Sequence, residues 1–168
     1  MKKRENPWYV ATMLLGVRPR SVAELFGRLA DKGFPLDEVQ RTVDKCRELG
    51  YLNDREFAAG VCDQVLACKT VGKKKLYVKL RWFGLKEDLI SEIMAEKLPP
   101  EKELEMAQYA GNKKKQQLIK RGIAKEKWYQ KISQYLLGRG FGGEVVGRTV
   151  GKICDKNYED PKFSISNF

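Results

Sequence analysis

The stretch DKGFPLDEV, residues 31–39, has the residue types of a junction between two helices. Gly33 can end the first helix, because glycine adopts a left-handed backbone conformation without steric cost. Phe34 can pack into a core, and Asp37 and Glu38 suit the first turn of a second helix, where the helix dipole favours negative charge. The stretch therefore predicts one helix that ends near Gly33 and another that begins just before Asp37.

The same junction occurs twice more, as WFGLKEDLI at 82–90 and as GRGFGGEVV at 138–146. We align the three copies on Gly33, Gly84 and Gly140. The residues 8 and 4 positions before the glycine, and those 1, 6 and 10 positions after it, are then apolar in every copy. The fifteen positions are Leu25, Leu76, Ile132, Leu29, Leu80, Leu136, Phe34, Leu85, Phe141, Val39, Ile90, Val146, Val43, Met94 and Val150. Offsets four apart share one face of a helix. The chain therefore contains an internal repeat of a helix pair.

An acidic residue follows each junction glycine by four positions, where it faces the positive end of the second helix. These residues are Asp37, Asp88 and Glu144. A further helix is predicted before each pair, within 7–17, 53–69 and 99–122. In the longest of them, the Gly111-Asn112 pair is a candidate kink or break.

Two segments have the pattern of a capping box at a helix N-terminus. Ser21 and Glu24 stand three residues apart at the start of the first pair. Asn53 and Glu56 have the same spacing at the start of the next helix. Both segments therefore predict helices that begin directly after the capping residue.

The pattern predicts an all-α protein of three tandem three-helix repeats, because no segment has the sustained alternation of a strand. A unit of about fifty residues buries little core alone. We therefore expect the repeats to stack into an elongated, curved array of right-handed sense. The predicted repeats cover residues 1–50, 51–98 and 99–156, followed by an irregular C-terminal tail at 157–168.

The charge balance favours a polyanionic partner. With 33 basic and 22 acidic residues among 168, the net charge is +11. Nucleic acid, or a protein coated with it, suits such a charge, and the alternative is solubility alone. No stretch approaches about 18 uninterrupted apolar residues, so no transmembrane helix is predicted. The opening MKKRENPWYVATMLLGV resembles a signal peptide only weakly, because no small-residue cleavage site follows, and we expect a monomeric cytoplasmic protein that does not bind membranes.

The chain has no histidine, which removes histidine-based acid–base catalysis, Ser-His and Cys-His nucleophiles and histidine metal ligands. No phosphate-binding loop or dinucleotide motif is present. The four cysteines, Cys46, Cys62, Cys68 and Cys154, lack metal-site spacing and are expected to be buried thiols. We therefore expect neither catalytic activity nor a cofactor or metal.

One basic cluster lies within 60–82, where six basic residues accompany a single acid, Asp63. In the helix predicted over 73–83, Leu76, Leu80 and Phe83 share the inward face. The candidate contact residues flank that face and are Lys73, Lys74, Lys75, Lys79, Arg81 and Trp82. They suit a groove lined with acidic side chains or phosphates, and the alternative is an ordinary solvated helix face.

A second basic cluster lies within 110–131, with eight basic residues against Glu126 alone. Cations at helix C-termini explain part of this excess. The candidate contact residues are Lys113, Lys114, Lys115, Lys120, Arg121, Lys125 and Lys127, with Lys131 beside them and Arg139 at a later turn. Arg18 and Arg20 are weaker candidates at a turn.

The aromatic residues near these clusters have two interpretations. Trp82 can stack on a base or on another aromatic side chain, or it can pack between repeats. Tyr51, Trp8 and Trp128 are expected to anchor cores rather than contact a ligand.

Four segments, taken together, resemble the RecX family of bacterial recombination regulators. They are RPRSVAELFGRLADKGFPLDEV at 18–39, ELGYLNDREFA at 48–58, GKKKLYVKLRWFGLKEDLI at 72–90 and LLGRGFGGEVV at 136–146. The resemblance runs from about Val10 to Asp155. Trp82 and the Gly142-Gly143 pair depart from the residues common in the family.

This resemblance implies three tandem three-helix repeats that bind the RecA recombinase filament on single-stranded DNA. It also implies suppression of the filament's ATP hydrolysis, strand exchange and coprotease activity, and in some members direct binding to DNA. The alternative that the residues leave open is a basic helical module that binds single-stranded nucleic acid without a recombinase partner.

Overall fold

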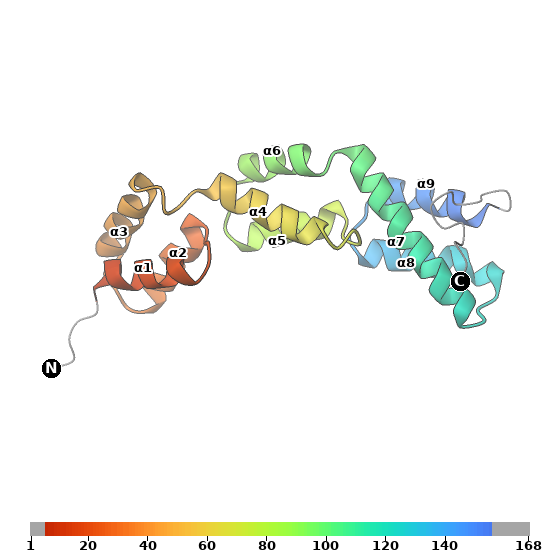
Figure 1. Cartoon of the computed structure of the whole chain (residues 1–168), viewed down its shortest axis with the longest axis horizontal. Helices are drawn as coiled ribbons and strands as arrows, with labels where there is room; N and C mark the ends of the chain where they lie inside the picture. Colours follow the sequence, from red (N-terminus) through yellow and green to blue (C-terminus); the bar gives the residue numbers. More distant parts are fainter. Residues whose placement is uncertain (1–5, 156–168) are drawn as a thin grey trace, which may run out of the picture. The chain divides into compact units, whose positions relative to one another are not determined.

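The computed structural model describes residues 6–155, and this part of the chain contains α-helices, one 3-10 helix and no strand (Figure 1). The prediction of an all-α protein is confirmed. The elements are α1 (Pro7–Val17), α2 (Val22–Asp31), α3 (Leu36–Glu48), α4 (Asp54–Leu66), α5 (Lys73–Trp82), α6 (Glu87–Lys97), α7 (Pro100–Lys120), η1 (Lys125–Lys127), α8 (Trp128–Gly138) and α9 (Gly143–Cys154). The tail predicted at 157–168 lies outside the described residues.

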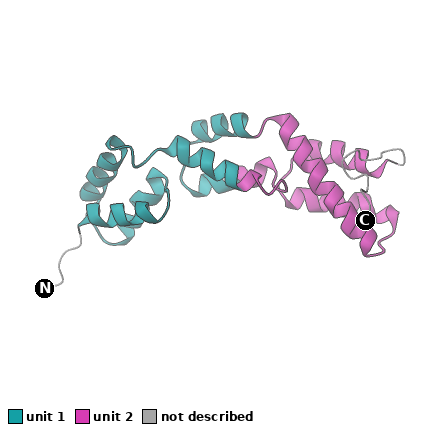
Figure 2. Ribbon diagram, in the orientation of Figure 1, with its two compact units in different colours: residues 1–64, 77–97 teal, residues 65–76, 98–168 magenta. Residues whose placement is uncertain are grey.

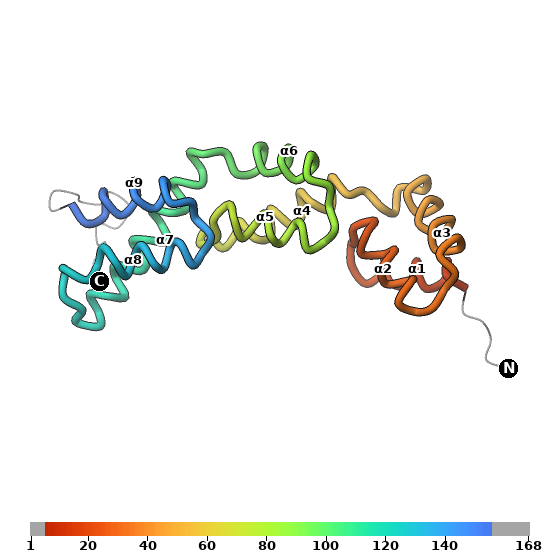
Figure 3. The backbone as a smooth tube through the Cα atoms, turned by 180° about the vertical axis from the view of Figure 1, so that it is seen from behind, coloured from red at the N-terminus to blue at the C-terminus, as the bar shows by residue number. Residues whose placement is uncertain are grey.

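The chain divides into two compact units, coloured separately in Figure 2. The first comprises residues 1–64 and 77–97, and the second comprises 65–76 and 98–168. Within the first unit, α1, α2 and α3 pack on one another. Within the second, α7, α8 and α9 do the same, as the tube in Figure 3 also shows. The boundaries of the three predicted repeats remain a prediction.

The three junction glycines have the backbone conformation that the sequence predicts. Gly33, Gly84 and Gly140 have φ of 82°, 73° and 88°. Each donates its N–H to the carbonyl three residues earlier, at 2.8 to 2.9 Å. This left-handed region is costly for residues with a Cβ atom. The three helix ends are therefore equivalent, and the repeated junction is confirmed in backbone geometry.

The repeated apolar positions form the cores. Fourteen of the fifteen are buried, and Phe34 is half-buried and packs against a core of the first unit that includes Leu25 and Val39. Full burial of such a side chain contributes roughly 1.5–3 kcal/mol. The acids at +4 lie in the first turns of α3, α6 and α9, as predicted.

The two predicted capping residues both cap their helices. Ser21 Oγ accepts the N–H of Glu24 at 3.0 Å. Asn53 Oδ1 accepts two N–H groups, from Arg55 at 3.1 Å and from Glu56 at 3.2 Å. Each cap satisfies donors that have no partner within the helix.

Helix α7 is continuous through Gly111 and Asn112, so the candidate break is wrong, while a kink remains a prediction. Gly111 is instead a packing residue. A Cβ atom there would lie 2.6 Å from Ile153 Cδ1 of α9. The missing side chain allows α9 to approach α7 closely, and this contact explains the glycine.

In the first unit, the start of α2 is held by residues from later in the chain. The N–H of Val22 donates to Asp54 Oδ1 at 2.8 Å, and the Ser21 hydroxyl donates to the carbonyl of Phe83 at 2.5 Å. A Cβ atom on Gly84 would lie 2.5 Å from Ala23 Cβ. The start of α2 therefore receives a carboxylate from α4 and packs against the junction after α5.

In the second unit, the start of α5 is held in the same way. The N–H of Lys73 donates to Glu103 Oε1 of α7 at 3.0 Å, and the N–H of Lys74 donates to the carbonyl of Gly140 at 2.9 Å. A Cβ atom on Gly72 would lie 2.3 Å from the backbone nitrogen of Phe141. Both helices thus begin at a carboxylate from a later helix and beside a later junction glycine.

Candidate functional site

The basic side chains of α5 surround a buried face. Leu76 and Leu80 are fully buried, and Phe83, just beyond the helix, is half-buried. All six candidate contact residues of this helix are exposed: Lys73, Lys74 and Lys75 in the second unit, and Lys79, Arg81 and Trp82 in the first. The predicted inward face is confirmed, while a contact role for the exposed residues remains a prediction.

Arg81 and Trp82 have neighbours within the first unit. Arg81 forms an exposed ion pair with Glu87 at 3.5 Å, and Glu87 also accepts a hydrogen bond from the Tyr77 hydroxyl at 2.8 Å. This hydrogen bond to the carboxylate, more than burial or charge, raises the pKa of Tyr77. Trp82 is 75% exposed, and its ring meets the Phe83 ring edge-on with centroids 5.0 Å apart. Most of the indole is therefore open to a partner.

The second basic cluster lies in the second unit, on α7, η1 and α8. Its exposed members are Lys113, Lys120, Arg121, Lys125, Lys127 and Lys131. Lys115 is half-buried, donates to the carbonyl of Ile153 at 2.8 Å and lies 5.7 Å from the Trp128 ring. Lys114 and Arg139 each lie 5.3 Å from the Tyr135 ring. These three cations therefore make internal contacts, which the sequence did not predict.

Arg18 and Arg20 form the turn between α1 and α2. The Arg20 guanidinium is almost buried, donates to the carbonyl of Leu14 at 3.2 Å and forms an ion pair with Glu24. Arg18 is more exposed and bonds the same carboxylate, with its shorter contact at 2.5 Å. Glu24 therefore neutralises two arginines, and Arg20 is a structural residue.

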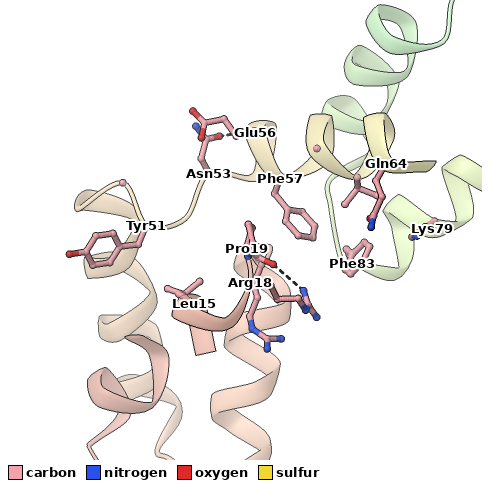
Figure 4. A pocket seen from close by; sticks show the side chains of 14 residues that line it. Leu15, Arg18, Pro19, Tyr51, Asn53, Glu56, Phe57, Gln64, Lys79 and Phe83 are labelled. Carbon is pink, nitrogen blue, oxygen red and sulfur yellow. Dashed lines mark hydrogen bonds between the residues drawn. The ribbon is translucent and has the colours of Figure 1, made fainter. Parts of the chain in front are cut away.

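The first unit also contains a cavity of about 720 Å³ that the sequence did not predict. Figure 4 shows its lining, which comes from the α1–α2 turn, the segment between α3 and α4, helix α4 and the end of α5. The lining residues are Leu15, Arg18, Pro19, Arg20, Gly50, Tyr51, Asn53, Glu56, Phe57, Gly60, Val61, Gln64, Lys79 and Phe83. No motif marks this set, because separate segments contribute to it.

The aromatic anchors differ from their predicted role at one position. Tyr51 is 56% exposed and lines the cavity, so the prediction of a core anchor is wrong there. Its ring centroid lies 6.3 Å from that of Trp8, which is half-buried against the first core. Trp128 is half-buried and its indole N–H donates to the carbonyl of Ile123 at 2.8 Å.

The cysteines are free thiols with unequal exposure. Cys46 and Cys62 are buried as predicted, Cys154 is half-buried, and Cys68 is exposed, which corrects the prediction for that residue. Burial raises the pKa of the Cys46 and Cys154 thiols. Within residues 6–155, no group of three or more acidic, cysteine or histidine residues could hold a metal ion. None of the described helices is long and apolar enough to cross a bilayer.

The helices, junctions and exposed basic side chains define an all-α helical-repeat protein, and comparison with known proteins gives its family. The model of the first three-helix domain of RecX matches residues 10–46, and that of the third matches residues 101–150. Regulatory protein RecX of Pelodictyon phaeoclathratiforme is 30% identical over 136 residues, which cover 81% of each chain. The chain belongs to the RecX family.

Two further relatives bear on length and fold. Regulatory protein RecX of Clostridium perfringens is 27% identical over 135 residues, or 80% of this chain and 62% of that protein. The chain therefore spans less than two thirds of that relative. The crystal structure of RecX from Lactobacillus salivarius has a TM-score of 0.77 and 17% identity, and the match covers 88% of this chain and 94% of that one. The likeness to this structure concerns the fold.

Proposed function

We propose that this protein binds the filament that a RecA-type recombinase forms on single-stranded DNA, and that it inhibits the filament's ATPase, strand-exchange and coprotease activities. Its membership of a family whose members are named regulatory proteins supports this proposal. The observation that carries it is the exposure of five cations on α5 around a buried apolar face. Exposed cations on a chain of net charge +11 favour a partner built of acidic protein and phosphates.

The mechanism that we propose is multivalent. Each repeat supplies a weak contact, and the contacts add because one chain links them. Binding across several protomers would resist the changes that accompany ATP hydrolysis and would limit access to the DNA. The protein supplies binding and no chemistry, and it requires no cofactor.

A second candidate function is binding to single-stranded nucleic acid without a recombinase. Tyr129 is 55% exposed and lies between Lys127 and Lys131 in the sequence. An exposed aromatic ring among lysines is the arrangement on which bases stack while phosphates are neutralised. This candidate assigns the second basic cluster, rather than α5, as the contact surface.

One pair of measurements separates the two functions. The DNA-dependent ATPase of the cognate recombinase is titrated with the protein, and affinity is measured for the filament and for the same bare strand at equal salt. Under the first function, the rate of ATP hydrolysis falls, and the protein binds the filament more tightly than it binds the bare strand. Equal affinity for both, without inhibition, would favour the second.

A further inference from the structure

The cavity of the first unit has an apolar floor. Phe57 and Phe83 meet edge-to-face with ring centroids 5.0 Å apart, and Val61 is buried beside them in the lining. Leu15 adds apolar surface at the side of α1. The volume of about 720 Å³ falls in the range of ligand pockets, roughly 300–1,000 Å³, and far exceeds the space of one water molecule. The cavity can therefore receive a bulky apolar group.

Gly60 keeps one wall of the cavity open. It lies within α4, where a glycine destabilises a helix by about 1 kcal/mol relative to alanine. A Cβ atom on Gly60 would meet no other atom within 4 Å. Close packing therefore does not require the glycine, in contrast to Gly111. A side chain at this position would instead project into open space at the cavity.

The polar groups at the cavity have a small positive excess. Arg18 and Arg20 share the carboxylate of Glu24, and Glu56 adds a second negative charge. Lys79 is exposed and forms no ion pair with another described residue. Three cations against two carboxylates leave one positive charge, which suits one carboxylate of a ligand rather than a run of phosphates.

We propose that this cavity is a docking site for an acidic peptide segment of a protein partner. One bulky apolar side chain of the segment enters the floor formed by Phe57, Val61 and Phe83. A neighbouring carboxylate of the segment pairs with Lys79 at the edge. At protein interfaces, an apolar side chain buried in a pocket usually supplies much of the binding energy. A charged pair at the rim adds to the specificity. Single-stranded nucleic acid fits less well, because its phosphates would meet Glu56 while only one cation lacks a partner.

The test uses the full chain, labelled with nitrogen-15, and no recombinase or DNA, so its failure is distinct from failure of the proposed function. The probe is a synthetic acidic hexapeptide with Phe-Leu at its centre, flanked by Asp and Glu. We expect the amide signals of Gly60 and Val61 to shift on titration. Replacing Phe-Leu by Ala-Ala, or the acids by lysines, should weaken the affinity by at least about tenfold.

Gly60→Leu is the blocking variant. It fills the cavity with a strong helix former, so the protein should remain folded while peptide affinity falls by at least about tenfold. Gly147→Leu is the matched control, because Gly147 is also an exposed helical glycine with nothing within 4 Å of a Cβ atom and lies in the other unit. Its affinity should equal that of the parent chain. If Gly60→Leu does not fold, Lys79→Ala tests the same cavity by removing the exposed cation at its edge.

Three results would overturn the proposal. The first is no shift at Gly60 and Val61 with the acidic peptide at millimolar concentration. The second is equal affinity of the parent chain and Gly60→Leu for that peptide, or equal affinity of the parent chain for the basic peptide. The third is tighter binding of a thymidine oligonucleotide to the same residues, which would make the cavity a nucleic-acid site.

Discussion

The buried carboxylate of Glu103 accepts the backbone N–H of Lys73 at 3.0 Å, and this hydrogen bond places an acid from α7 at the positive end of α5. Asp54 does the same for Val22 at the start of α2. Val22 and Lys73 each stand eleven residues before their own junction glycine, so the two contacts are equivalent in the repeat. The basic first turn of α5 is thus held in position by Glu103, which is not itself a candidate contact residue.

We expect Glu103→Ala to lower the free energy of unfolding by about 1–3 kcal/mol, because it leaves a part-buried N–H without its charged acceptor. Glu103→Gln keeps an acceptor oxygen and should cost less. Urea denaturation followed by circular dichroism measures both. Glu105→Ala, at an exposed position of the same helix, is the control and should stay within about 0.5 kcal/mol of the parent. Equal stability of Glu103→Ala and the parent would show that the hydrogen bond adds nothing.

The junction glycines should differ in their sensitivity to substitution. Gly33→Ala meets only the backbone cost of positive φ, about 1–2 kcal/mol, because nothing lies within 4 Å of its Cβ position. Gly84→Ala adds a clash, since its Cβ atom would lie 2.5 Å from Ala23 Cβ. Thermal denaturation should therefore rank Gly84→Ala as less stable than Gly33→Ala, and Gly84→Val as less stable still.

A double-mutant cycle isolates the clash at Gly84. Ala23→Gly removes the atom that the new Cβ would meet, so Gly84→Ala should cost less in that background than in the parent. The same cycle with Gly33→Ala should be additive. Additivity at Gly84 as well would mean that only its backbone conformation matters.

Thiol labelling should distinguish the four cysteines by burial. At mildly alkaline pH, Cys68 is exposed and should react first with an aromatic disulfide reagent that reports each thiol by absorbance. Cys154 should react more slowly, because burial raises its pKa and less of it is thiolate. Burial also raises the pKa of Cys46, and its side chain is fully buried, so it should react only on unfolding, as should buried Cys62. Loss of the fast phase in Cys68→Ala would confirm the assignment, and its persistence would contradict it.

The sequence was sufficient for features that depend on neighbours along the chain. Helical periodicity and glycine turns are local, so Leu25, Leu76 and Ile132 were placed in cores and Gly33 was assigned positive φ without reference to tertiary contacts. Gly111 was misinterpreted, because a helical glycine that admits Ile153 has the same local sequence pattern as one that allows a kink.

Features that depend on distant segments could not be predicted in this way. The Glu103 contact joins residues thirty positions apart, and an acid early in a helix is already explained by the helix dipole. The cavity is lined by Leu15, Tyr51, Gly60 and Phe83, which come from separate segments. A cavity forms only where neighbouring side chains leave space between them, which the sequence does not show. Tyr51 was expected in a core because aromatic residues usually pack there, whereas it lies at the rim of that cavity.

The last prediction tests the proposed contact surface on α5. Lys75→Glu with Lys79→Glu changes the local charge by four units at two exposed positions. Surface helix substitutions usually change the free energy of unfolding by no more than about 0.5 kcal/mol per site, so the melting transition should persist. Inhibition of the recombinase ATPase should be largely lost, because repulsion replaces attraction at the interface. The defect should shrink as salt rises, since screening weakens the altered interaction.

The matched control reverses Lys32 and Lys86, which are also exposed but lie outside both basic clusters. This control carries the same total charge as the α5 variant, so it separates a local contact from the effect of net charge. The control should inhibit nearly as well as the parent chain. If the two double variants inhibit equally well, or fail equally, α5 is an ordinary solvated helix face. The contact surface would then be sought among Lys113, Lys120, Arg121, Lys125 and Lys127, which remain exposed on the second unit.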